Sequence, residues 1–157
     1  MRTHSLVQST RLLEKVVELS PIRIDVSLFL PRVPAVGPLI QHVASPLLVR
    51  LPYSWEDDDE LARPKPSWDA ERHLAAPRPV IFDFHPAHVY LNSRSPGAYI
   101  ALKLQKNRLS AVTQGEAAHL ISNGDGTRSM FEWLVRALER QTSMTVSDLV
   151  EHARVAG

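Results

Sequence analysis

The chain has 157 residues, of which 44% are hydrophobic and 22% charged, and its formal net charge is +1. This length predicts one domain, and the near-neutral charge without a basic stripe argues against nucleic acid as a partner. No apolar run is long enough to span a membrane and no signal peptide is evident, so we expect a cytoplasmic protein. The absence of cysteine excludes disulfides, thiolate zinc sites and cysteine nucleophiles.

The first third of the chain predicts a helix followed by two strands. Residues 5–19 carry Leu and Val at helical spacing, whereas residues 22–30 alternate apolar and polar positions. Several prolines interrupt residues 31–46, and the short apolar run at residues 47–51 is typical of a buried strand.

The middle of the chain predicts a surface connection and one further strand. Five consecutive acidic residues, 56–60, open a segment with several prolines, which indicates a solvated loop with a short helix around residues 68–74. Residues 80–84, Val-Ile-Phe-Asp-Phe, form the most strand-like run of the chain. A polar segment at residues 92–97 follows.

The last third predicts helices at residues 114–122, 127–141 and 146–153, because apolar residues recur there at helical spacing. Thr145 and Asp148 have the spacing of a capping box at the start of the third helix. The whole pattern predicts an α/β fold with few parallel strands and flanking helices. Since a closed (β/α) barrel needs about 250 residues, the chain is either a small open α/β domain or a part of a larger fold.

The strand at residues 80–84 ends at a candidate catalytic residue, His85. In α/β folds reactive groups project from the carboxyl ends of strands, and an imidazole serves as acid or base near neutral pH. A histidine that only caps the strand end is the structural alternative. Asp83, His85 and His88 are all of metal-ligand type, but Pro86 redirects the chain between them, which argues against a metal site there.

A second candidate group follows the strand at residues 47–51. Trp55 beside Asp57 suits a sugar-binding wall, because an indole packs on the apolar face of a pyranose while a carboxylate accepts its hydroxyl hydrogen bonds. Acidic runs are more often solvated, and we expect this of residues 58–60. Arg2 has the chemistry to orient a carboxylate, although arginines near a terminus are usually exposed.

Two other motif classes are excluded. The sequence Gly124-Asp125-Gly126-Thr127 lacks the spacing of a phosphate-binding loop, so we predict a turn before a helix and no nucleotide site. No serine lies in a G-x-S-x-G elbow, which leaves no basis for a serine hydrolase.

Four strings of residues resemble one known family. They are Arg-Thr-His-Ser-Leu at 2–6, Asp-Val-Ser at 25–27, Leu-Pro-Tyr-Ser-Trp-Glu-Asp-Asp at 51–58 and Phe-Asp-Phe-His-Pro-Ala-His-Val-Tyr-Leu-Asn at 82–92. Together they resemble the carboxyl-terminal half of the bacterial polysaccharide deacetylase-like proteins, the NodB-homology carbohydrate esterases. The resemblance extends over residues 2–140, and the last string is its most specific element.

The resemblance implies a fold and a reaction. The fold is the carboxyl-terminal portion of a distorted (β/α) barrel, which makes residues 1–157 one incomplete domain. The reaction is removal of N- or O-acetyl groups from a polysaccharide or glycan precursor, with a divalent metal, expected to be zinc, in the full-length family. The partner is therefore an acetylated polysaccharide or sugar.

The resemblance also gives roles to individual residues. His85 is similar to the histidine that protonates the leaving group, Arg2 to the arginine that orients the catalytic base, and Asp57 with Trp55 to the motif that lines the groove. These expectations give two sets, the catalytic residues His85, Arg2 and Asp57 and the substrate-binding residues Trp55, Tyr53 and Phe84.

The family segments that carry the base and the metal ligands are expected before Arg2. We therefore expect no metal ligand in this chain, and we expect a truncated product, or a start assigned too late, that is inactive alone. One alternative is a noncatalytic carbohydrate-binding or protein-interaction module derived from the same fold. Another is a degenerate fragment that does not fold independently, because a partial barrel exposes strand edges.

Overall fold

The computed structural model describes residues 1–3, 6–31, 39–41, 48–74, 80–105, 108–140 and 143–155. His4 and Ser5, and most of the stretch predicted to be irregular at 31–46, lie outside this part. The chain divides into two compact units. The first comprises Met1–Trp55, Arg78–Ile81 and Ser143–Gly157, and the second comprises Glu56–Pro77 and Phe82–Thr142.

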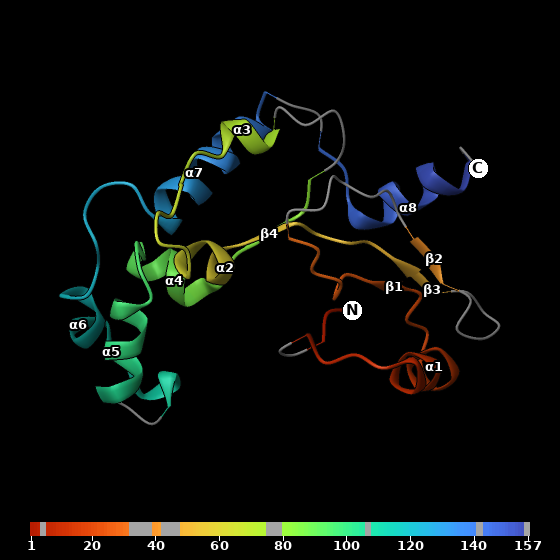
Figure 1. Ribbon diagram of the computed structural model, residues 1–157, viewed down its shortest axis with the longest axis horizontal. Helices are drawn as coiled ribbons and strands as arrows, with labels where there is room; N and C mark the ends of the chain where they lie inside the picture. The colour runs from red at the N-terminus through yellow and green to blue at the C-terminus, as the bar shows by residue number, and fades with distance from the viewer. Residues whose placement is uncertain are drawn as a thin grey trace. The chain divides into compact units, whose positions relative to one another are not determined.

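The first unit has helices around a small sheet (Figure 1). Its elements are α1 (Thr10–Leu19), β1 (Ile24–Asp25), β2 (Leu39–Gln41), β3 (Leu48–Arg50) and α8 (Val146–Val155). The central strand β3 is parallel to β1 and antiparallel to β2, and its register with β1 pairs Asp25 with Arg50. Short parallel strands with helices confirm the mixed α/β class, whereas β2 was not predicted.

The strand predicted over residues 22–30 is much shorter in the structure. The side chain of Asp25 accepts hydrogen bonds from the backbone N–H of Ser27 at 3.1 Å and from its hydroxyl at 2.5 Å. Local side-chain bonds of this kind compete with the ladder of a sheet. Regular pairing therefore ends at Asp25, and beyond it an isolated parallel bridge joins Phe29 to Tyr53.

The apolar core of the first unit lies on both sides of β3. Helix α1 buries Leu13 and Val17 against Leu48, and α8 buries Val150 in a second cluster with Val49 and Leu51. The helix predicted from residue 5 begins at Thr10, because the side chain of Ser9 accepts a hydrogen bond from Leu12 and caps it. The capping box of Thr145 and Asp148 is confirmed at the start of α8.

The second unit is mostly helical. Its elements are α2 (Asp57–Leu61), α3 (Glu71–Leu74), β5 (Phe82–Asp83), α4 (Pro86–Leu91), α5 (Gly97–Gln105), the 3-10 helix η2 (Leu109–Ala111), α6 (Gln114–Ala118) and α7 (Thr127–Leu138). The chain enters it through β4 (Trp55–Glu56), which pairs with β5. Leu91, Leu102 and Ala117 form a buried core among α4, α5 and α6.

The loop predicted at the acidic run is wrong, since residues 57–61 form α2. Of the residues expected to be solvated, Asp58 is exposed whereas Glu60 is buried. Asp57 and Glu60 are buried, with exposed fractions of 0% and 1%. The Glu60 carboxylate accepts a hydrogen bond from the backbone N–H of Ser67 at 2.6 Å and pairs with Arg63 at 3.0 Å. Carboxylates in a first helical turn are also stabilised by the helix dipole, which offsets the repulsion among these four acids and allows the helix to form.

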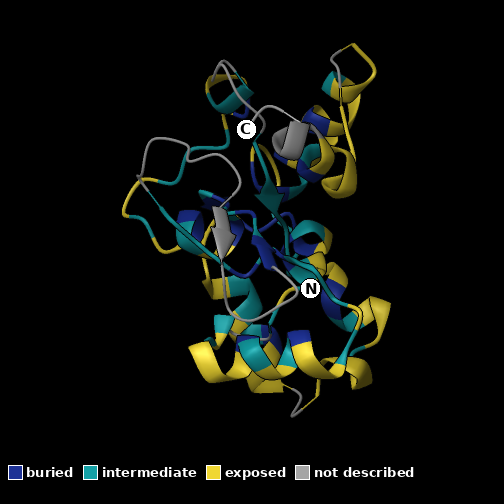
Figure 2. Ribbon diagram, turned by 90° about the vertical axis from the view of Figure 1, so that its right-hand side faces the viewer, coloured by how far each residue is buried: buried dark blue, intermediate teal, exposed yellow. Residues whose placement is uncertain are grey.

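Helices of the chain carry both buried and exposed residues (Figure 2), and α7 is one example. Met130 and Leu134, four positions apart, are buried, whereas Val135 and Leu138 are 47% and 51% exposed. The apolar stripe is therefore wider than the core that it contacts. Among the described residues, the structure contains no helix with the length and hydropathy of a membrane span.

Asn92 joins α4 to α7. Its backbone ends α4 in the left-handed conformation with φ 46°. Its side-chain amide donates to the carbonyls of Ser122 at 3.0 Å and Gly124 at 2.8 Å, and its oxygen accepts from the backbone N–H of Arg128 at 3.0 Å. The Asn92 side chain thus provides an acceptor for a backbone N–H at the start of α7. It also bonds to the turn that was predicted around Gly124 and Gly126.

Gly126→Ala is expected to destabilise the protein by about 2 kcal/mol, the usual range for overpacking. A Cβ at Gly126 would lie 2.7 Å from both oxygens of Asn92 and 3.0 Å from the carbonyl of Ser93. Urea unfolding measures the loss. Gly115→Ala is the control, because a Cβ there meets nothing within 4 Å and alanine favours the helix. Equal stabilities of the two variants would contradict this explanation.

Candidate active site

Two helix starts in the second unit carry the polar groups of the candidate site. Asp57 and Asp58 are the first residues of α2, directly after β4. His85 precedes α4, where Pro86 occupies the first helical position and fixes the entry angle of the chain. Because β4 and β5 are paired, the residues that follow them come close together although 28 positions separate Asp57 from His85.

Asp57 holds His85 at two points. One carboxylate oxygen lies 2.6 Å from Nδ1 of the ring, and the other accepts the backbone N–H of His85 at 2.8 Å. The Asp57 side chain is fully buried, whereas the His85 side chain is 35% exposed. A carboxylate at Nδ1 selects the tautomer with its proton on that nitrogen, so Nε2 is the atom left for a substrate.

The surroundings of His85 favour its charged form. The hydrogen bond to Asp57 raises the pKa of His85 to about 9, against the opposing effect of burial, and the negative charges of Asp57, Asp58 and Asp83 add to the rise. The imidazole therefore carries a proton at neutral pH and is suited to donate it, as a general acid must.

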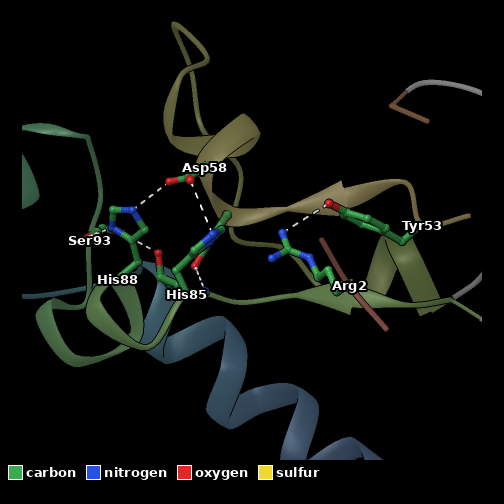
Figure 3. Close-up of polar contacts among 8 residues, drawn as sticks. Arg2, Tyr53, Asp58, His85, His88 and Ser93 are labelled. Atoms are coloured by element: carbon green, nitrogen blue, oxygen red, sulfur yellow. Dashed lines mark hydrogen bonds and ion pairs between the residues drawn. The ribbon is translucent and has the colours of Figure 1, made fainter. Parts of the chain in front are cut away.

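A second histidine orients the other carboxylate (Figure 3). His88 is 3% exposed, and its Nε2 lies 2.8 Å from Asp58 while its Nδ1 lies 3.0 Å from the hydroxyl of Ser93. The second oxygen of Asp58 is 3.6 Å from Nε2 of His85. Asp58 is therefore held between the two rings, and the buried Ser93 and His88 fix its position.

Asp57, Asp58 and His85 also offer ligand atoms within 4.8 Å of one another. Both oxygens of Asp57 are already engaged by His85, which leaves Nε2 of His85 and one carboxylate as open donors. A catalytic zinc ion takes three protein ligands, so these residues alone do not fit one. Within the described residues, Asp83 and His88 do not join this group.

The stability of the protein is expected to fall as the pH rises from about 6.5 to about 9. His85 has a raised pKa in the folded state, so its contribution is complete below 6.5 and is lost as the pH passes about 9. Solvent screening of a ring that is 35% exposed limits the effect to the order of 1 kcal/mol. Urea unfolding should give the wild type and Asp57→Asn free energies of unfolding whose difference becomes smaller as the pH rises. A difference that stays constant over this pH range would contradict the raised pKa of His85.

Three of the residues proposed from the sequence lie in the first unit. Arg2 is exposed and its guanidinium lies 3.4 Å from the hydroxyl of Tyr53, whose ring stacks on Phe29 at 5.1 Å. Tyr53 and Trp55 are each only 2% exposed. Neither ring therefore has an open face for a sugar. An aromatic ring suits an apolar core as well as a sugar-binding wall, so its presence in the sequence does not decide between the two.

Phe84 has an accessible neighbourhood in the second unit. Its ring meets Phe131 edge-on at 5.3 Å, and both line a mostly apolar groove of about 610 Å³ with Pro86 and Val89. The residues on both sides of His85 in the sequence, Phe84 and Pro86, thus line this groove.

Asp58, His88 and Ser93 were not predicted as site residues. The H-x-x-H spacing signalled His88, but only as a metal ligand, and nothing in the sequence pairs it with Ser93. In the first unit, the ion pair of Arg50 with the buried Asp25, at 2.9 Å, was not predicted either. Strand register signals this pair, since the two residues are partners across β1 and β3.

Comparisons with known proteins identify the family and a similar fold. No curated protein matches the chain. A solved structure, that of WbmS, a candidate polysaccharide deacetylase involved in O-antigen biosynthesis from Bordetella bronchiseptica, is similar in fold with a TM-score of 0.62 and 23% identity. The match covers 87% of this chain and 54% of WbmS, so the chain spans about half the length of that protein. A family model described as WbmS-like polysaccharide deacetylase matches residues 1–103. The chain therefore belongs to the WbmS-like polysaccharide deacetylase family.

Proposed function

We propose that the chain supplies the proton-donating part of a polysaccharide deacetylase that removes N- or O-acetyl groups from a glycan. The two-point contact between Asp57 and His85 carries this proposal, because it gives a charged imidazole with one outward nitrogen. The family match supports the class of reaction. In this proposal residues 1–157 form the carboxyl-terminal part of a distorted (β/α) barrel.

The proposed role of His85 is to give the proton on Nε2 to the sugar nitrogen or oxygen as its bond to the acetyl carbon breaks. Water supplies the hydroxyl group that joins this carbon, so that the acetyl group leaves as acetate. Asp57 keeps the ring in one orientation and stabilises its charge before the transfer, as a buried carboxylate does for other catalytic histidines. Asp58, held by His88, lies on the Nε2 side of the ring and is placed to accept a hydrogen bond from the substrate. Arg2 and Phe84 keep the roles that the resemblance gives them, Arg2 in orienting the catalytic base and Phe84 in binding the substrate.

We further propose that the divalent ion expected from the family is held by residues other than Asp57 and His85. The described residues offer too few open donors at this site, so turnover by the chain alone should be slow. No step of the proton transfer depends on where those other ligands lie.

The test is release of acetate from N- and O-acetylated oligosaccharides, with and without added zinc. We expect slow release that exceeds that of His85→Gln under the same conditions. If wild type and variant release acetate equally while the oligosaccharide still binds, the noncatalytic carbohydrate-binding module replaces this proposal.

A further inference from the structure

A second hollow in the second unit has the composition of a sugar site. The chain has three tryptophans. Trp55 is buried, whereas Trp68 and Trp133 both line an open cavity of about 720 Å³. This volume is within the usual range for ligand sites, about 300–1,000 Å³. Two indoles in one open cavity provide the apolar faces that a pyranose ring needs.

The charges of this cavity select among sugars. Its lining includes the acidic residues Asp69, Glu71 and Asp125 and one arginine, Arg94. Arg94 also lies 3.4 Å from the carbonyl of Asn123, which directs part of its guanidinium to the backbone. An excess of carboxylates disfavours phosphorylated or carboxylated sugars and favours a ligand with a positive charge.

The supporting elements hold these side chains in place. Trp133 and Ser129 lie one helical turn apart on α7, and Ser129 exchanges hydrogen bonds with Gly126 at 2.8 and 2.9 Å, which fixes the start of that helix. Asp69 accepts the backbone N–H of Glu71 at 3.1 Å at the start of α3. Helix α7 therefore carries Ser129 and Trp133 on one side of the cavity, while Trp68 and Asp69 lie in the segment just before α3.

We propose that this cavity binds an amino sugar, that is, a glycan unit whose acetyl group has already been removed. A protonated amine is attracted both by the carboxylates and by the face of an indole, while the carbon face of the ring packs on the other indole. This choice rests on the proposed deacetylase function, since loss of an N-acetyl group converts a neutral amide into that amine. The cavity then holds the deacetylated end of the glycan while a further sugar unit of the same glycan reacts.

Calorimetric titration with two probes tests this site, at mildly acidic pH where amines are protonated. The glucosamine tetrasaccharide should bind at least tenfold more tightly than its fully N-acetylated counterpart. Trp133→Ala and Asp125→Asn should each weaken glucosamine binding about fivefold or more, in line with the strength of aromatic and cation contacts. Asp125 is exposed and its replacement is isosteric, so this variant tests the site without disturbing α7.

Leu138→Ala and Glu139→Gln are matched controls, because both residues are exposed on or just after α7 and lie outside the cavity. They should leave binding within twofold of the wild type. Equal affinity for the two probes, tighter binding of the acetylated one, binding that none of the variants changes, or no binding would each overturn the inference. His85→Gln separates the two proposals: loss of acetate release with glucosamine binding intact supports both, and His85-dependent release without glucosamine binding removes only the cavity.

Discussion

Replacing His85 with Gln is expected to lower acetate release by about 10²–10⁴-fold, the usual contribution of a general acid. Gln keeps a polar side chain at the start of α4 but has no proton to give. Because the transfer belongs to the transition state, kcat should fall while KM changes little. His119→Gln is the matched control, since His119 is an exposed histidine at the end of α6.

The pH dependence of acetate release tests the role of His85 as an acid independently. If His85 acts as an acid, the wild-type rate should fall as the pH rises through about 9, where the ring loses its proton. The residual rate of His85→Gln should lack this step. A variant with the wild-type rate and profile would remove His85 from the mechanism, whatever its contact with Asp57.

Asp25→Ala is expected to destabilise the first unit by about 3–5 kcal/mol, the usual cost of breaking a buried ion pair. Asp25 is fully buried and binds Ser27 through one oxygen and Arg50 through the other, at 2.9 Å. In the variant, Arg50, whose side chain is only 12% exposed in the wild type, loses this carboxylate as its ion-pair partner. The same Arg50 also contacts Gln8 of the segment before α1, so the loss should reach the packing of that helix.

Guanidinium-induced unfolding followed by circular dichroism measures this effect. Asp59→Ala is the control, because Asp59 and Arg63 form a surface pair with 27% and 28% exposed side chains. Pairs of that kind contribute about 0.2–1 kcal/mol. Comparable losses in the two variants would mean that the buried pair does not stabilise the first unit.

The sequence pattern predicted the elements whose signal is local. Helices α1, α7 and α8 and strand β3 follow from apolar spacing, and the box of Thr145 and Asp148 marks a helix start correctly. Helix α2 was not predicted because five consecutive acids suggest charge repulsion and a solvated loop. The groups that bind the Glu60 carboxylate in the folded protein cannot be recognised from the sequence. Helix α4 was missed because Pro86 was taken as a break, although proline suits a first helical position.

The candidate site was partly predictable for a different reason. His85 and Asp57 follow strand ends, and the resemblance gives both of them catalytic roles although 28 positions separate them. Burial is a tertiary property, so the sequence could not distinguish the enclosed Trp55 from Trp68 and Trp133, which line an open cavity. The support of Asp58 by His88 and Ser93 depends in the same way on how α2 and α4 pack.

NMR titration of the His85 ring, in the presence of a chelator, measures the effect of the Asp57 contact without any need for turnover. We expect a pKa of about 9 in the wild type and a value near the ordinary 6.5 in Asp57→Asn. A wild-type ring that titrates near 6.5, with no change in Asp57→Asn, would contradict it.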